Sequence, residues 1–380
     1  MVKQLDDLKV AIVADWLTDR GGAERVILEL AKIFPQADIF TSVYKAENFP
    51  ELANRRVVTS YLQNWPLRFK HQVYSWARPK AFESLNLDAY DLVISSSSAE
   101  AKGVITQPYT THLCYCHTPT RYYWSNYHQY MKANQFGLFD PIVKWFLPST
   151  IHRLREWDRV AADRVDFFIG NSKYVADRIR KYYNAPAEVI YPPVDFTRFS
   201  DGQAEEGDYY LVLGWQIPYK RTDLVVEAFK QLSHKLKVVG DGPELEKLKK
   251  SASGLQNIEF LGRIPDTDVT KAVLGCKALI FPQEEDFGIV PLEAMSAGRP
   301  VIAFGKGGAL ETVVDNVTGI LFPEQTAQSL IDAIHKFEQT NISPEACREQ
   351  AKKFDVSVFV DQIKTYISAK VGTKPTAREL

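Results

Sequence analysis

The sequence has few cysteines, no excess of charge of either sign and no long apolar run. Its four cysteines, Cys114, Cys116, Cys276 and Cys347, are too few for a disulfide framework and fit a reducing compartment. The 46 Lys and Arg residues balance 47 Asp and Glu residues, which disfavours nucleic acid as a partner because dedicated nucleic-acid binders normally carry a basic excess. No segment approaches a membrane span of about 18 uncharged apolar residues, and the polar, acidic start does not resemble a signal peptide. We therefore expect a cytoplasmic protein that crosses no bilayer.

Short runs rich in Val and Ile alternate with amphipathic stretches along nearly the whole chain. Strands buried on both faces, with helices between them, are typical of parallel sheets covered by helices, so the pattern predicts an α/β fold. The expected strands are 9–14, 38–43, 91–96, 112–116, 166–170, 187–191, 209–214, 235–240, 257–261, 278–282, 300–304 and 319–322. The expected helices are 22–34, 173–183, 222–233, 243–252, 290–298, 326–340 and 345–353.

The length and the pattern together predict two domains. A chain of 380 residues exceeds the roughly 100–200 residues of one domain. The strand–helix pattern restarts near residue 208, after a polar, acidic and glycine-bearing stretch (192–207) that is typical of a linker. We predict two doubly wound domains, 1–198 and 208–354, with a cleft between them. Such sheets bind ligands at the carboxyl ends of their strands, so motifs there are the best candidates for function.

Two glycine-bearing turns follow expected strands. Gly21 and Gly22 let the backbone pass close to a ligand, and the helix that begins near Ala23 directs its amide groups at the same spot. A flexible turn without a ligand explains the same residues. In the second turn, 240–244, Pro243 suits the first position of a helix, so structure alone explains the motif. Neither turn carries the G-x-G-x-x-G fingerprint, which disfavours a nicotinamide cofactor.

The segment 281–298 is the richest in candidate site residues. It follows an apolar strand, turns at Gly288 and opens a helix near Ile289, with Glu285 in the turn and Glu293 one helical turn inside. Amide groups at this helix end offer an anion site, while the glutamates accept hydrogen bonds from hydroxyl groups. A nucleotide sugar, which is anionic and polyhydroxylated, satisfies both. Acids that cap the first turn of the helix are the alternative explanation.

The run E-D-F-G-I-V-P-L-E-A-M-S-A-G-R-P-V-I-A at 285–303, with G-G-A-L-E-T-V at 307–313, resembles the retaining glycosyltransferases of family 4. The resemblance covers nearly the whole chain and includes Gly21–Gly22 and the turn 240–243. It implies the GT-B fold, in which two Rossmann-like domains face each other and a C-terminal helix, here 355–372, crosses back to the N-terminal domain. The N-terminal domain is then expected to bind the acceptor and the C-terminal domain the nucleotide sugar.

The same resemblance assigns roles to single residues of the C-terminal domain. Glu293 is expected to bind the ribose hydroxyls of the donor, and Glu285 the hydroxyls of its sugar. Lys220 is expected to neutralise the diphosphate, which gains negative charge as the glycosidic bond breaks. The further donor contacts implied are the backbone amides of Phe287, Gly288 and Ile289, together with Gly21 and Gly22 of the first domain.

The chain departs from the family pattern beside the expected diphosphate site. Many relatives place Arg directly after the residue that matches Gly214, whereas this chain has Trp215. Arg221 could replace that charge, or Trp215 could stack on a base or an acceptor. Arg263 lies where the backbone of the family usually meets the base.

His117 is the candidate catalytic residue of the first domain. It resembles the histidine that lies beside the anomeric carbon in relatives and assists the transfer; a histidine that caps a strand end is the alternative. Retention through a covalent intermediate would need a carboxylate below the anomeric carbon, and no such residue is evident. The resemblance favours departure and attack on one face, with His117, Glu285 and Lys220 as the catalytic set.

No metal or cofactor is expected. Cys114 and Cys116 share one face of a strand while His117 lies on the other, and no second ligand pair accompanies them. The D-x-D pattern at 266–268 follows Pro265 and opens a helix, so capping explains it.

Aromatic residues, 12% of the chain, gather in the first domain. The segment 61–80 mixes aromatic rings with cations and contains no acid, and 137–148 adds FGLFDPIVKWFL. This mixture suits a bilayer interface with anionic lipid, and core aromatics beside a solvated charged face are the alternative. The hypothesis is peripheral attachment to the inner face of the cell membrane through both segments. The cations of the first are Arg68, Lys70, Arg78 and Lys80, and the rings expected to stack on acceptor sugars are Tyr122, Tyr123 and Trp124.

The H-T-P-T-R-Y-Y-W stretch and the P-Y-K-R-T-D-L run are most similar to the O-antigen mannosyltransferase branch of the family. This similarity implies GDP-mannose as the donor and a lipid-linked or polysaccharide glycan as the acceptor, with a UDP-hexose as the alternative donor. Two other functions stay open for the same fold. One is a non-hydrolysing epimerase of UDP-amino sugars, which needs no acceptor. The other is an inactive nucleotide-sugar-binding subunit, which only Trp215 suggests.

Overall fold

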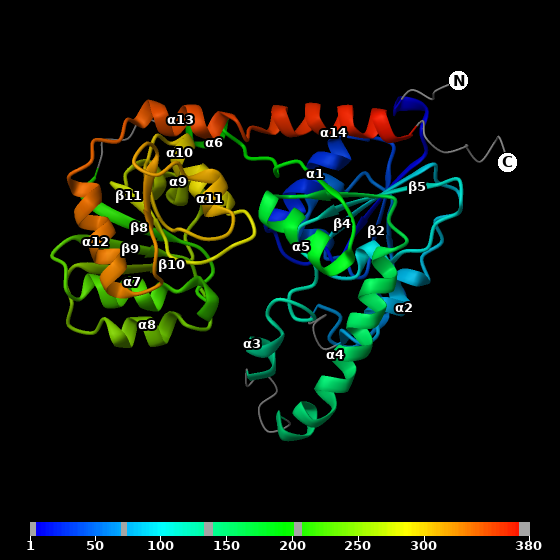
Figure 1. The fold of residues 1–380 in the computed structure, drawn as a ribbon, viewed down its shortest axis with the longest axis horizontal. Coiled ribbons are helices and arrows are strands. Elements are labelled where there is room, and N and C mark those ends of the chain that lie inside the picture. The colour runs from blue at the N-terminus through cyan, green and yellow to red at the C-terminus, as the bar shows by residue number, and fades with distance from the viewer. Residues whose placement is uncertain (1–4, 70–73, 133–139, 201–206, 372–380) are drawn as a thin grey trace. The chain divides into compact units, whose positions relative to one another are not determined.

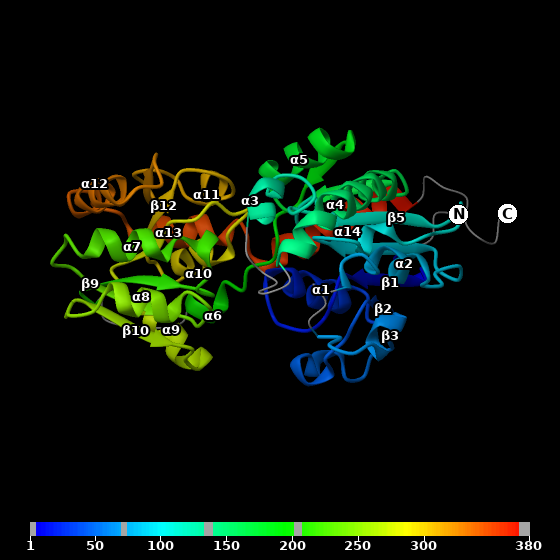
Figure 2. The ribbon, with the colours of Figure 1, turned by 90° about the horizontal axis from the view of Figure 1, so that it is seen from below.

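The computed structural model describes residues 5–69, 74–132, 140–200 and 207–371. The chain divides into two compact units. The first comprises Met1–Pro192 and Phe359–Leu380, and the second comprises Pro193–Val358. Each unit is built on one parallel β-sheet with helices on both faces (Figures 1 and 2).

The first unit has a seven-stranded sheet in the order β3-β2-β1-β4-β5-β6-β7. Its strands are β1 (Val10–Ala14), β2 (Asp38–Thr41), β3 (Val57–Thr59), β4 (Leu92–Ser97), β5 (Thr111–Cys116), β6 (Phe167–Gly170) and β7 (Ala187–Val189). Its helices are α1 (Gly22–Ile33), α2 (Arg78–Glu83), α3 (Tyr127–Lys132), α4 (Asp140–Ala162) and α5 (Lys173–Tyr183).

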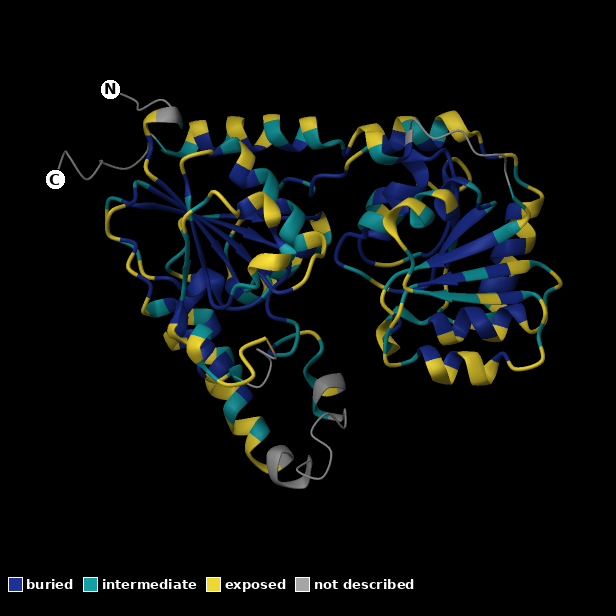
Figure 3. Cartoon of the chain, turned by 180° about the vertical axis from the view of Figure 1, so that it is seen from behind, coloured by how far each residue is buried: buried dark blue, intermediate teal, exposed yellow. Residues whose placement is uncertain are grey.

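The second unit has a six-stranded sheet in the order β10-β9-β8-β11-β12-β13. Its strands are β8 (Tyr209–Leu213), β9 (Lys235–Val239), β10 (Ile258–Gly262), β11 (Ala278–Phe281), β12 (Val301–Phe304) and β13 (Gly319–Phe322). Its helices are α6 (Thr197–Ser200), α7 (Thr222–Phe229), α8 (Leu245–Ser251), α9 (Asp266–Leu274), α10 (Ile289–Ser296), α11 (Ala309–Thr312), α12 (Ala327–Glu338) and α13 (Pro344–Lys352). Figure 3 shows the central strands of both sheets buried and the outer faces of the helices exposed.

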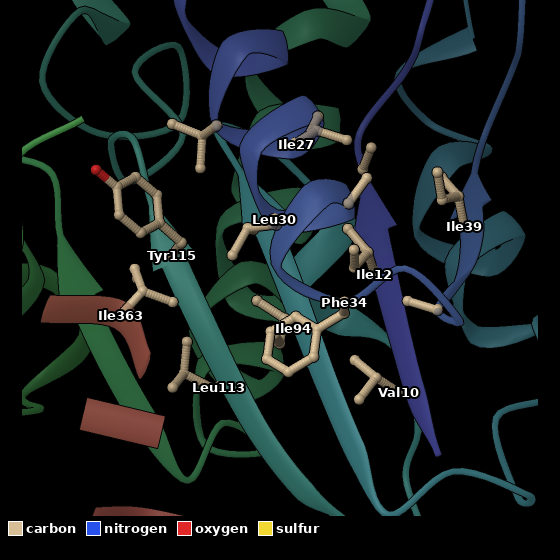
Figure 4. Packing of buried hydrophobic residues seen from close by; sticks show 14 of the residues in the cluster. Val10, Ile12, Ile27, Leu30, Phe34, Ile39, Ile94, Leu113, Tyr115 and Ile363 are labelled. Atoms are coloured by element: carbon tan, nitrogen blue, oxygen red, sulfur yellow. The ribbon is translucent and has the colours of Figure 1, made fainter. Parts of the chain in front are cut away.

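The central strands of the first unit are buried on both faces, as parallel strands under two helical layers must be. Every residue of β1 is buried. Val10 and Ile12 pack on one face with Leu30 of α1 and with Phe34, which directly follows this helix (Figure 4), while Ala11 and Val13 pack on the other. The alternation follows from the two-residue period of a strand.

The last helix, α14 (Val356–Val371), begins at the end of the second unit and completes the core of the first. Phe359, Ile363 and Ile367 are buried at the four-residue spacing of one helix face. They join the cluster around β1, and the ring of Phe359 lies 5.9 Å from that of Tyr115 on β5. Figure 4 shows Ile363 beside Leu113 and Tyr115. The expected return of the C-terminal helix is thus present.

Every expected strand is present, displaced by at most two residues at either end. The expected helix 222–233 is too long, because the structure ends α7 at Phe229. The side chain of Asn257 donates to the carbonyls of Phe229, Leu232 and His234 and so satisfies acceptors at and after the end of the shorter helix. Strand β3 and helices α2, α3, α4 and α6 were not among the expected elements, whereas α9 begins at Asp266, where the sequence predicts the start of a helix.

The passage between the units lies earlier in the chain than predicted. Residues from Pro193 onward belong to the second unit, because Val194 donates to Phe354 and accepts from Val356, both at 3.1 Å. Helix α6 then packs against α9 and α10. The predicted linker therefore contains a helix, and 201–206 lie outside the described residues.

Helix α4 is the longest of the described helices. In Figure 1 its N-terminal half extends away from the sheet of its own unit. The sequence of α4 shows no helical pattern, because Pro148 lies inside the helix and an aromatic run precedes this proline. Among the described residues, no helix combines the length and apolar character needed to cross a membrane. Residues 70–73 and 137–139 of the two aromatic segments lie outside the described residues.

The packing of α14 predicts a stability effect. Ile363 is 1% exposed, and truncation of a buried Ile to Ala costs about 2–5 kcal/mol. Ile363→Ala should therefore lower the free energy of unfolding of the first unit by about that amount, measured by urea denaturation followed by circular dichroism. Thr365→Ala, at an exposed position of the same helix, is the control. Equal stability of the two variants would show that α14 does not support this core.

Candidate active site

The strand order of the second unit's sheet reverses between β8 and β11. From β8 the chain continues to β9 and β10 on one side, and from β11 to β12 and β13 on the other. The loops after β8 and β11 therefore leave adjacent strand ends in opposite directions, which is where open α/β sheets bind ligands. These loops, 214–221 and 282–288, carry Lys220 and Glu285.

Glycines fix the loop after β8 by close backbone contact. A β-carbon on Gly240 would lie 1.9 Å from the carbonyl oxygen of Gly214, and one on Gly242 would lie 2.3 Å from that of Gln216. Gln216 is 1% exposed, and its side chain donates to the Gly214 carbonyl at 2.7 Å and accepts from Thr222 Oγ1 at 2.7 Å. The turn 240–244 thus has a structural role, as predicted. The expected place of Pro243 at the first helical position is wrong, because α8 begins at Leu245 with Glu244 as its N-cap.

Lys220 and Glu285 meet across the two loops. The ammonium of Lys220 donates to Glu285 Oε1, and both side chains are 18% exposed. Gln283 Nε2 donates to the same oxygen at 3.3 Å. The site therefore presents a cation and a carboxylate, each partly exposed to solvent, at the point where the strand order reverses.

The loop after β12 packs on the loop that carries Glu285. The backbone amide of Gly308 donates to the Glu285 carbonyl at 2.8 Å, and a β-carbon on Gly308 would lie 2.2 Å from Phe287. The side chain of Phe287 is buried, so only its backbone can contribute to a site. Gly288 precedes α10 with φ +88°, in the left-handed region that favours glycine. Its turn leads into Ile289, and the first amides of α10 point at this loop.

Glu293 lies on α10 and is 6% exposed. Its Oε1 atom is 3.9 Å from Arg198 Nη1 of α6, and Asp266 Oδ2, at the start of α9, is 3.7 Å from Arg198 Nη2. Sequence reasoning did not include Arg198, because it placed this residue at the edge of a linker.

Three other predicted positions of this unit differ in their settings. Arg221 has φ +56°, pairs with Asp223 at 3.2 Å and donates to Gln325 at 2.8 Å. Its guanidinium is thus engaged by Asp223 and Gln325. Arg263 is exposed after β10, and the side chain of Trp215 is 55% exposed.

In the first unit, Gly21 and Gly22 follow β1 and begin α1, as expected. Both are exposed, and a β-carbon on Gly21 would lie 2.9 Å from Glu24 Oε2. Burial raises the pKa of Glu24 to about 7. A carboxyl group that is readily protonated therefore stands beside the glycine turn.

His117 follows β5 and is 8% exposed. Its Nε2 atom lies 2.8 Å from Ser96 Oγ at the end of β4, and its backbone amide donates to Ser97 at 2.9 Å. Burial lowers the pKa of His117 to about 4. The imidazole is therefore neutral at neutral pH and able to exchange hydrogen bonds without bringing a charge.

Buried charged groups support the loops around His117, and sequence reasoning did not predict their burial. Asp15, after β1, accepts from the amides of Ser98, Ala99 and Ala101 at 2.6, 3.0 and 2.7 Å. The other buried groups form two ion pairs, Arg78–Glu100 at 2.9 Å and Lys102–Asp158 at 2.5 Å. Only the charges of Glu100 and Lys102 beside a run of small residues could have indicated them.

These buried groups overturn the predicted role of one aromatic residue. Tyr123 is fully buried and donates to Glu100 at 2.7 Å, so it cannot stack on an acceptor sugar. Trp124 donates to Asp158 at 2.7 Å and stacks on Tyr182 at 4.9 Å. The hydroxyl of Tyr122 contacts Arg78. The H-T-P-T-R-Y-Y-W stretch is therefore held from inside the unit.

The cysteines beside His117 belong to the core. Cys114 and Cys116 pack with Phe168 and Tyr183 on one face of β5, while His117 bonds Ser96. Within the described part of the chain, no three His, Cys, Asp or Glu side chains lie close enough to hold a metal ion.

Two family models match the chain. The one described as Glycosyltransferase Family 4 matches residues 20–198, and the one described as Glycosyl transferases group 1 matches residues 194–354. Together they extend over both units and include His117, Lys220 and Glu285.

Curated relatives align with part of the chain. An uncharacterized glycosyltransferase of Methanocaldococcus jannaschii is 30% identical over 53% of this chain and 58% of that protein. The alpha-1,3/1,6-mannosyltransferase ALG2 of Mus musculus is 26% identical over 60% of this chain and 64% of that enzyme. The GDP-mannose-dependent alpha-(1-6)-phosphatidylinositol monomannoside mannosyltransferase of Mycolicibacterium smegmatis is 29% identical over 46% and 52%. Each alignment spans less than two thirds of the relative.

Solved structures share the fold. Anabaena HepE in complex with UDP has a TM-score of 0.70 at 18% identity, covering 95% of this chain and 100% of that one. WaaG, a glycosyltransferase of lipopolysaccharide biosynthesis, has a TM-score of 0.68 at 16% identity, covering 94% and 99%. The expected GT-B fold is therefore confirmed.

The buried neutral histidine predicts a dependence of stability on pH. As the pH falls below about 6.5, the unfolded chain binds a proton at His117 that the folded chain takes up only near pH 4. Stability is therefore complete above about pH 6.5 and is lost toward pH 4, by up to about 3 kcal/mol. His117→Gln should remove this loss in urea denaturation between pH 4 and 7.

The raised pKa of Glu24 acts in the opposite sense, since it lowers stability as the pH rises from about 4.5 to 7. It is present in both proteins and cancels in their difference. His335→Gln, at an exposed position of α12, should keep the wild-type profile. A His117→Gln profile parallel to that of wild type would contradict the buried neutral state.

Proposed function

The chain belongs to glycosyltransferase family 4, and from this membership we propose that it is a retaining transferase that moves a hexose from a nucleotide sugar. The proposed donor is GDP-mannose, and the proposed acceptor is a lipid-linked or polysaccharide glycan of the cell surface. The relatives support mannose, because they include alpha-1,3/1,6-mannosyltransferases and a GDP-mannose-dependent mannosyltransferase.

The observation that carries the proposal is the contact between Lys220 and Glu285 at the point where the strand order reverses. In the proposed complex, Lys220 binds the diphosphate and stabilises the charge that develops as the glycosidic bond breaks. Glu285 accepts hydrogen bonds from the sugar hydroxyls, and Glu293 from the ribose hydroxyls. The amides of Gly288 and Ile289, at the start of α10, meet the sugar and the diphosphate.

His117 is proposed to lie beside the anomeric carbon during transfer. A neutral imidazole suits this place, because a cation would repel the positive charge that develops on the sugar. The departing diphosphate accepts the proton of the acceptor hydroxyl, so that attack and departure occur on one face. The proposal includes no metal ion and no cofactor.

The first unit is proposed to attach to anionic lipid at the inner face of the cell membrane. Its exposed apolar side chains include Leu67 (60%), Trp76 (60%), Trp145 (80%) and Phe146 (61%). Arg68 and Lys80 are exposed between them in sequence, and segment 61–80 contains no acid. Arg78 is 2% exposed and paired with Glu100, so its predicted place among the membrane-facing cations is wrong.

Site variants test the donor assignment. Glu293→Ala and Lys220→Met should each weaken GDP binding about 10- to 100-fold, because each removes a charged hydrogen-bonding group. His117→Ala should leave GDP binding unchanged and lower mannosyl transfer. Titration calorimetry measures binding, and release of GDP from GDP-mannose with a lipid-linked acceptor measures transfer.

Lys277→Met is the control, since Lys277 precedes β11 at the opposite edge of the sheet and pairs with Glu338. A panel with UDP-hexoses identifies the base and the sugar. Equal affinity and rate in the Glu293 and His117 variants would refute the assigned roles, and conversion of a donor to its epimer without acceptor would refute the transferase.

Vesicle binding tests the membrane proposal. The protein should sediment with phosphatidylglycerol vesicles at low salt and dissociate as salt rises, because salt screens the attraction between lysine or arginine and the lipid. Trp145→Ser with Phe146→Ser should weaken this binding, whereas Leu310→Ser, 57% exposed in the second unit, should not. Failure of the wild type to bind anionic vesicles at low salt would end the proposal.

A further inference from the structure

Helix α6 brings an arginine to the proposed nucleotide site from a segment that the sequence predicts to be a linker. Asp195 caps the helix, because its Oδ1 atom accepts from Thr197 Oγ1 at 2.8 Å and from the Arg198 amide at 3.2 Å. Phe199 is 1% exposed and anchors the helix in the unit, which packs against α9 and α10. The backbone of Arg198 is thus held from both ends.

The guanidinium of Arg198 lies between two carboxylates. It is 3.9 Å from Glu293 and 3.7 Å from Asp266, with its own Cζ atom 5.0 Å from the ring centre of Phe199. Both separations exceed the length of an N–H···O hydrogen bond. The cation therefore attracts the carboxylates without holding either in a tight hydrogen-bonded pair.

The two carboxylates differ in what this attraction does. The side chain of Asp266 is 91% exposed, so water screens its pairing and the contribution is small. The side chain of Glu293 is 7% exposed, where a lower dielectric strengthens the attraction and an uncompensated charge is unfavourable. The stronger effect of Arg198 is therefore on Glu293.

We infer that Arg198 is a positioning residue that orients the buried Glu293 carboxylate to accept hydrogen bonds from the ribose of the donor. The inference rests on the proposed function, which assigns Glu293 to the ribose. Arg198 suits the role better than Lys, because its planar group packs on the Phe199 ring while its N–H groups face two acceptors. Donor recognition then begins directly after the chain enters the second unit at Pro193.

The test compares GDP with 2′,3′-dideoxy-GDP, which lacks both ribose hydroxyls that Glu293 would accept from. By calorimetry the wild type should prefer GDP about 10- to 100-fold. Arg198→Met should reduce this preference to about threefold or less, and Arg198→Lys should give an intermediate value. Glu293→Gln should lose the preference equally, and adding Arg198→Met to it should cause no further loss, since both act on one contact.

Lys271→Met is the matched control, because it breaks a neighbouring pair on α9, Lys271–Asp268 at 3.0 Å; it should keep the full preference. UDP and 2′,3′-dideoxy-UDP are measured alongside, so that a uridine donor gives the same comparison. A wild type that binds neither GDP nor UDP would refute the proposed function and with it this role. A wild type that prefers the ribose form, with that preference unchanged in Arg198→Met and Arg198→Lys, would refute the role of Arg198 alone.

Discussion

The meeting of Lys220 and Glu285 depends on close backbone approaches that only glycine permits. Gly240 and Gly242 let the turn after β9 lie against Gly214 and Gln216, and Gly308 lets the turn after β12 lie against the loop of Glu285. Each added β-carbon would lie within 2.3 Å of a backbone atom. The neighbouring turns therefore support the two site loops from opposite sides, and the positions of the loops determine where Lys220 and Glu285 lie at the carboxyl ends of the strands.

In the first unit, buried charged groups in place of glycines fix the loops around His117. Asp15 binds three amides of the loop after β4, and the pairs Arg78–Glu100 and Lys102–Asp158 tie the same loop to α2 and α4. Buried pairs add little net stability, but loss of one partner is strongly unfavourable, so they define one arrangement. His117 stays neutral within it, because burial opposes its protonation.

The fold and the segment that carries Glu285, Gly288 and Glu293 could be predicted from the sequence, because they depend on local pattern. Strand alternation predicts both sheets, and the turn before a helix predicts the surroundings of Glu285, Gly288 and Glu293. Arg198 and Tyr123 could not be assigned in this way. Their settings depend on partners such as Glu293 and Glu100, which are 95 and 23 residues away in sequence, and composition near a residue says nothing about distant partners.

Exposure separates the charged groups that hold the fold from those suited to a ligand. Arg78, Glu100, Lys102 and Asp158 are at most 2% exposed, so exchange of their partners would require opening the core. The side chains of Lys220 and Glu285 are 18% exposed, and that of Arg198 is 29% exposed. At such intermediate exposure a charge is desolvated enough to bind strongly yet can exchange a protein partner for a phosphate or hydroxyl oxygen. The near-zero net charge is therefore an average over groups with opposite tasks, and only their depth distinguishes them.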